Sequence, residues 1–181
     1  MKTQKICIYL FMVSALMFSC DELDELTEFD VDAGFNTVIS VAIAEQTDGG
    51  DSSATLSETA VIDISENQDI ADNFDLIENV SITSLTYQID NYSVGDDDAT
   101  ITNASITFGS TTINIDDINL KNADDSDTVY EIDNTSQLGT IGNFLENNPV
   151  LNVVLNGTVS STPVQFNIRV NLDTTVTIDA V

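Results

Sequence analysis

The chain has 181 residues with 31 acidic and four basic side chains, no histidine, no tryptophan and two cysteines, so its formal net charge is −27 at pH 7. A surface this negative repels nucleic acid and anionic lipid head groups and favours cations or basic partners. Without histidine, and with both cysteines in the first 20 residues, the rest of the chain has no serine–histidine triad, cysteine nucleophile or zinc site built on histidine or cysteine.

The first 19 residues have the organisation of a secretory signal peptide. Lys2 and Lys5 precede an apolar run from Ile6 to Phe18, whose 13 residues are fewer than the roughly 20 that a membrane-spanning helix needs. We therefore predict that residues 1–19 are an export signal that is removed. The cysteine that follows, Cys20, would then be the first residue of the mature protein.

The end of this segment resembles a bacterial lipobox. Its sequence is Met17-Phe18-Ser19-Cys20, in which only Phe18 departs from the usual small residue. The acidic residues that follow resemble the surface-export signal of Bacteroidetes-type lipoproteins, and they are Asp21, Glu22, Asp24 and Glu25. The resemblance implies lipidation at Cys20 and an outer-membrane anchor, with the domain facing the cell exterior or the periplasm. The alternatives are a secretory signal with an incidental cysteine and a merely solvated acidic tether.

Residues 20–33 are predicted to be an acidic flexible tether, and residues 34–181 a single β-sandwich domain. Removal of residues 1–19 leaves 162 residues, which is one domain's worth. Only Lys121 and Arg169 then remain as bases against 31 acids, a side-chain balance of −29. The domain has no cysteine pair, so aliphatic packing must stabilise it.

Alternating apolar and polar residues predict strands along most of the domain, with turns or loops at 47–53, 95–98 and 109–110 and an acidic loop at 122–127. A bulge near Thr83 and Ser84 reconciles two phases of the alternation in the third strand. The expected strands are residues 34–44, 60–64, 80–93, 101–108, 113–120, 129–132, 151–159 and 164–180.

Apolar residues at helical spacing predict a helix at 66–78, where the stripe consists of Ile70, Phe74 and Ile77. Ser65 and Gln68 have the spacing of a capping box at its start. A second helix is expected at 138–145, before Pro149, although two glycines weaken it.

The last two strands are predicted to pair with each other through a turn at 160–163. Asn156-Gly157 is a competing hairpin turn that would change the register. Seven or eight short strands with one apolar face each can bury those faces only against a second sheet or by closing on themselves. We therefore predict an all-β fold, an antiparallel β-sandwich with one or two short helices.

Clustered aspartates are the candidate metal ligands, because hard cations such as Ca²⁺ take six to eight oxygens. The clusters are Asp96, Asp97 and Asp98; Asp116 and Asp117; and Asp124, Asp125 and Asp127. None matches the EF-hand loop. The alternative is a solvated acidic face that protects sheet edges from aggregation.

Tyr92 and Tyr130 flank acidic segments and are the candidate residues for stacking on a glycan, whereas Tyr87 has the parity of a core residue. The sequence favours a non-catalytic structural or binding module with no cofactor, unless calcium is bound. A basic protein or a glycan is the expected partner. The alternatives are a calcium-dependent adhesion or glycan-binding lipoprotein and a glycosidase with two carboxylates.

Overall fold

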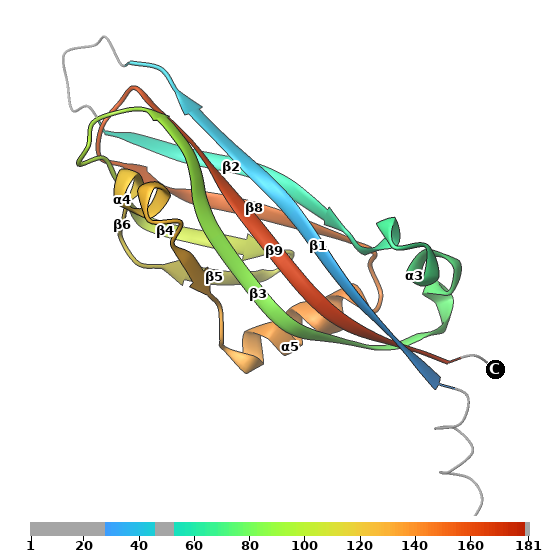
Figure 1. Cartoon of the computed structure of the whole chain (residues 1–181). Coiled ribbons are helices and arrows are strands. Elements are labelled where there is room, and N and C mark those ends of the chain that lie inside the picture. Colours follow the sequence, from blue (N-terminus) through green and yellow to red (C-terminus); the bar gives the residue numbers. More distant parts are fainter. Residues whose placement is uncertain (1–27, 46–52, 180–181) are drawn as a thin grey trace, which may run out of the picture.

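The computed structural model describes residues 28–45 and 53–179, which form two antiparallel sheets packed face to face (Figure 1). The first sheet contains, in spatial order, β1 (Glu28–Ile43), β9 (Val164–Asp179), β3 (Ile77–Val94) and β7 (Val129–Glu131). The second contains β2 (Ala54–Asp63), β8 (Val150–Val159), β4 (Thr100–Phe108) and β5 (Thr111–Ile115), and β6 (Ile118–Asn119) pairs with β4. The predicted all-β sandwich is confirmed, with nine strands in the described residues instead of seven or eight.

Three short α-helices accompany the sheets in the described residues, against the one or two predicted. They are α3 (Gln68–Asp72), α4 (Leu120–Asp125) and α5 (Thr135–Leu145). No helix in this part of the chain is long and apolar enough to span a membrane.

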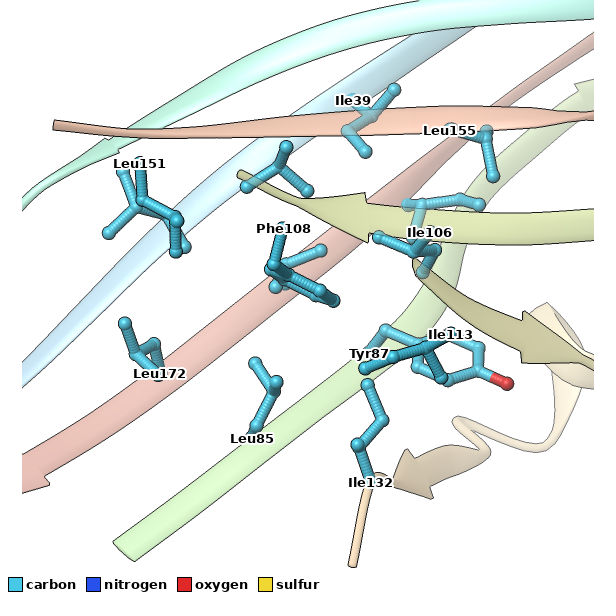
Figure 2. Packing of buried hydrophobic residues seen from close by; sticks show 14 of the residues in the cluster. Ile39, Leu85, Tyr87, Ile106, Phe108, Ile113, Ile132, Leu151, Leu155 and Leu172 are labelled. Carbon is cyan, nitrogen blue, oxygen red and sulfur yellow. The ribbon is translucent and has the colours of Figure 1, made fainter. Parts of the chain in front are cut away.

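Alternate residues of both sheets fill the space between them. In the first sheet Ile168 of β9 is paired with Ile39 of β1 on one side and with Ile89 of β3 on the other. Ile106 and Leu155 are paired in the second sheet, and all five side chains are buried. Figure 2 shows Ile39, Ile106 and Leu155 in this core. Burial of each such side chain contributes about 1.5–3 kcal/mol. The core is mostly aliphatic, as expected from the composition.

The first strand begins earlier than predicted. The tether prediction is wrong for residues 28–33, which belong to β1, while residues 20–27 lie outside the described residues. Asp30 and Asp32 point to the solvent face and accept hydrogen bonds from the hydroxyls of Thr177 and Thr175 at 2.9 and 2.7 Å. The acidic composition therefore reflects one polar face of a strand.

The helix predicted at 66–78 is wrong in extent. A 3₁₀ turn (Ile64–Glu66), α3 and a second 3₁₀ turn (Phe74–Leu76) occupy this segment, and β3 begins at Ile77. The caps also differ from the capping box, because the Asn67 side chain accepts from the backbone N–H groups of Asp69 and Ile70. Only Ile70 of the expected stripe is fully buried.

The predicted pairing of the last two strands is wrong, because β8 pairs with β2 and β4 whereas β9 pairs with β1 and β3. Residues 160–163 therefore cross between the sheets. Asn156-Gly157 is not a turn but lies within β8. A Cβ at Gly157 would lie 3.1 Å from the Cβ of Ala104, so the glycine serves close strand packing.

Several local predictions are confirmed. A register shift falls between Ile82 and Ser84, where the bulge was expected. Gly109, with φ 59°, turns the hairpin between β4 and β5. The second predicted helix corresponds to α5. The acidic loop predicted at 122–127 is wrong, because residues 120–125 form α4, whose first turn the Asn119 side chain caps.

The two long sides of the sandwich differ. On one side the edge strands β1 and β2 lie against each other. On the other side the edge strands are β5 and β7. Here the chain crosses from the second sheet to the first through α4 and returns through α5, and both helices pack on β3. This second side contains a hollow between the sheet edges.

Candidate functional site

The hollow, here called the β5–β7 cleft, has a volume of about 450 Å³. It is lined by residues 113–116 at the end of β5, by residues 129–134 in and after β7, and by Tyr87 and Gln137. Figure 2 shows Ile113, Tyr87 and Ile132 at this side of the core. The cleft therefore joins the edge of one sheet to the edge of the other.

Two stacked tyrosines form the aromatic part of the cleft. Tyr130 of β7 is directly opposite Tyr87 of β3, so both side chains lie on the inner face of the sheet. Their ring centroids are 5.0 Å apart and the rings are within 11° of parallel. Tyr87 is buried, as predicted, and Tyr130 is half-buried. Tyr130 is thus the more exposed ring of the pair.

Burial is the main cause that raises the pKa of Tyr87 to about 12, and the nearby Tyr130 and Asp116 raise it further. Burial also raises the pKa of Tyr130. Both phenols therefore carry their protons at neutral pH and present hydroxyl donors. Asp116 lines the same cleft as the two tyrosines.

The backbone of β7 directs polar groups away from its neighbour. The N–H of Ile132 donates to the carbonyl of Leu85 at 2.9 Å, which makes these two residues a hydrogen-bonded pair. In an antiparallel ladder such pairs alternate with pairs whose N–H and C=O groups point outward. The outward groups of β7 therefore belong to Val129 and Glu131.

The edge of β5 has the same property. Gln137 of α5 donates to the carbonyl of Thr112 at 3.2 Å, so this carbonyl points away from β4. The threonine hydroxyl lies 3.0 Å from that of Thr107, its cross-strand neighbour. By the same alternation the N–H and C=O of Asn114 also point outward, into the region of the cleft.

The cleft is acidic. Asp116, Glu131 and Asp133 line it, and all three are exposed. The two bases of the domain lie elsewhere in ion pairs. Lys121 contacts Asp125 at 2.7 Å, and Arg169 contacts Asp90 at 2.8 Å. No base lines the cleft, so its negative charge is not offset there.

The other candidate tyrosine, Tyr92, lies at a different place. Its hydroxyl donates to the backbone carbonyl of Asp96 at 2.6 Å, and the ring is half-buried over Gly95. Burial is the main cause that raises the pKa of Tyr92, and the nearby carboxylates of Asp96, Asp97 and Asp98 raise it further. Tyr92 and Asp124 line a separate polar hollow of about 600 Å³. Because the Tyr92 hydroxyl donates to the carbonyl of Asp96, it stabilises the turn at 95–98.

The candidate metal ligands are partly brought together. The Asn119 side chain donates to the carbonyl of Asp97 at 3.2 Å, which joins the turn at 95–98 to the start of α4. The pKa of Lys121 is raised mainly by its hydrogen bond to Asp125. The nearby carboxylates of Asp97 and Asp124 raise this pKa further. Asp116 and Asp117 line a third hollow. Across residues 28–45 and 53–179, no three histidine, cysteine, aspartate or glutamate side chains are grouped to hold a metal ion.

The predicted lipidation and export residues, 20–25, lie outside the described residues. Within the cleft, sequence reasoning singled out Tyr130 and Asp116 but missed Asn114, Glu131, Asp133 and Gln137. Their only sequence signal is polarity next to a short strand. Their proximity depends on β5 and β7 being the edges of two different sheets.

No protein-family model and no curated protein matches the sequence. Among solved structures, the chain is similar to one described as Desmodium yellow mottle tymovirus, with 9% sequence identity over 84% of this chain and 82% of that chain. The TM-score of 0.29 is too low for this likeness to bear on fold or function.

Proposed function

We propose that the chain is a lipid-anchored binding module without catalytic activity, displayed on the outside of the outer membrane, and that its ligand occupies the β5–β7 cleft. The observation that carries this proposal is the cleft itself, a hollow of about 450 Å³ that combines a stacked tyrosine pair with carboxylate and amide side chains. Ligand sites are typically concave, with aromatic surface and a few convergent polar groups.

The anchor rests on the resemblance of residues 17–25 to a lipobox and an acidic export signal. Acyl chains hold a protein on a membrane because each buried CH₂ contributes about 0.8 kcal/mol. A clickable fatty acid should label the wild-type protein and not the Cys20→Ala variant. Absence of label on the wild type would refute lipidation.

Surface display has its own test. Protease shaving of intact cells should degrade the wild type, and replacement of Asp21, Glu22, Asp24 and Glu25 by Ala should protect the protein by retaining it inside. Equal protection of both forms would place the wild type on the periplasmic face.

The absence of catalysis is supported by the residue types in the domain, which lacks histidine and cysteine and has one lysine and one arginine. The remaining enzymatic possibility is a glycosidase whose two carboxylates are about 5 Å or 6.5–9.5 Å apart. Assays for released reducing ends on polysaccharides should show no turnover. Turnover that the Asp116→Asn or Glu131→Gln variant abolishes would overturn this part of the proposal.

Glycan binding is a second candidate, favoured by the half-buried ring of Tyr130 in a polar hollow. A glycan array, probed with and without calcium, tests it. Binding should be lost in Tyr130→Ala and retained in Tyr92→Ala if the cleft is the site. Calcium-dependent binding that responds instead to Tyr92→Ala would move the site to the turn at 95–98.

A further inference from the structure

We propose that the β5–β7 cleft binds an extended peptide segment that carries basic side chains and pairs as an added strand with the outer edge of β7. This inference rests on the proposed binding function and specifies the chemistry of the ligand. Three independent features of the cleft support it, which are its backbone groups, its aromatic floor and its charge.

The backbone groups provide the pairing surface. The N–H and C=O groups of Val129 and Glu131 point away from β3, and those of Asn114 point away from β4. Peptides that add a strand to a sheet bind through such outward main-chain groups. A glycan would leave this row of alternating donors and acceptors largely unused, so the row favours a peptide.

The aromatic floor receives alternate side chains of the added strand. Successive side chains of a strand point to opposite faces of its sheet. Every second residue of a segment paired with β7 would therefore point inward, above Tyr130. The residues between them would point outward next to Val129, which at 58% exposure is the most exposed large apolar side chain in the described residues.

The charge selects basic side chains. Asp116, Glu131 and Asp133 line the cleft without a compensating base. A basic residue that points outward from the added strand, on the face of Val129, would meet Glu131, and one that points inward would meet Asp116. An arginine that lies over Tyr130 would also gain a cation–π interaction with the ring. The chemistry of the cleft is therefore complementary to a segment in which apolar and basic residues alternate.

The direct test is fluorescence anisotropy with the full-length protein in detergent and a short labelled peptide of alternating valine and arginine. We expect this peptide to bind and its valine–glutamate counterpart not to bind. A third peptide has the valine–arginine sequence with alternate backbone amides N-methylated on the edge that would face β7. It keeps the charge but loses the main-chain donors, so we expect it not to bind. Equal binding of the methylated and unmethylated peptides would overturn strand addition.

Charge is tested on the protein side by two triple variants that change the net charge equally. The first replaces Asp116, Glu131 and Asp133 by their amides, and the second replaces residues 96–98 by Asn. We expect the first to weaken binding of the valine–arginine peptide about tenfold, and the second to change it by less than about twofold. Equal weakening by both would mean that only overall charge attracts the peptide, and would overturn the proposed site.

The Val129→Pro variant removes an outward N–H without removing a hydrogen bond to β3, with Val129→Ala as its control. We expect weaker peptide binding in the proline variant alone, with unchanged circular dichroism. If the proline variant does not fold, the methylated peptide makes the same test from the ligand side. Glycan binding that depends on Tyr130, without peptide binding, would overturn this inference and leave the proposed function intact. Absence of any ligand from the cleft would overturn both.

Discussion

Two glycines of α5, three residues apart, should respond in opposite ways to the same substitution. A Cβ at Gly139 would meet nothing within 4 Å. A Cβ at Gly142 would lie 2.2 Å from the carbonyl oxygen of Val80, about 1.2 Å closer than the 3.4 Å at which ordinary van der Waals contact begins. The obstacle is backbone of β3, which no side-chain rotation can clear.

The magnitudes follow from two opposing effects. Alanine is favoured over glycine in a helix interior by about 1 kcal/mol, and this applies at both positions. Gly139→Ala should therefore stabilise the protein by about 0.5–1 kcal/mol. Gly142→Ala must also displace α5 from β3, and overpacking of this kind costs about 1–3 kcal/mol. Because the contact is with backbone, we expect the upper end of that range, and a net loss of about 2 kcal/mol.

Urea unfolding of the purified variants measures both effects. The midpoints should move to higher urea for Gly139→Ala and to lower urea for Gly142→Ala, with unchanged slopes if both variants keep the native compactness. Gly139→Ala is the matched control, since it makes the same chemical change in the same helix. Stabilisation of similar size by both substitutions would refute the close approach of α5 to β3.

Further predictions concern the core, the phenol and the charge. Ile168→Ala should cost about 2–5 kcal/mol in urea unfolding because it leaves a cavity between paired strands, whereas Val61→Ala, at an exposed position, should change stability by less than about 0.5 kcal/mol. Because burial raises the pKa of Tyr87 from 10.0 to about 12, the folded state holds this proton more tightly than the unfolded state. Stability should therefore fall as the pH rises from 10 through 12, and Tyr87→Phe should show a smaller fall. Added sodium chloride should raise the melting temperature by screening the net charge of −27. At high sodium chloride, calcium and magnesium should give equal further shifts in the wild type and in the triple Asn variant of residues 96–98, and a calcium-selective shift that this variant loses would reveal a site there.

The strands were the most predictable part of the fold. The alternation of apolar and polar residues identifies β3, β4 and β9 because each strand has one buried face. The same signal extends through Phe29 and Val31 of β1, but the acids that alternate with them, Glu28, Asp30 and Asp32, have the composition of a tether. The segment 66–78 has apolar residues three and four positions apart, a spacing that one helix would explain. Short helical turns joined at Asn67 and Asn73 have the same spacing, so the pattern does not distinguish the two arrangements.

Strand partners were less predictable than strands. The apolar face of β8 indicates that the strand is half-buried, but it does not specify whether β9 or β2 is its neighbour. The cleft has the same limitation. Tyr130 and Glu131 are adjacent in sequence, whereas Asn114 belongs to the other sheet and joins them only because the chain crosses through α4.

The position of β9 has a consequence for how the chain folds. This strand, residues 164–179, lies between β1 and β3. The first sheet therefore lacks the strand that joins β1 to β3 until β9, the last of the three in the sequence, has been synthesised. Its pairing with β1 joins Glu28 to Asp179, the first and the last of the described residues. Contacts this distant in sequence make folding slow, because the loop must close before the contacts form. The nascent chain should therefore remain unfolded, with β1 and β3 unpaired, until β9 emerges.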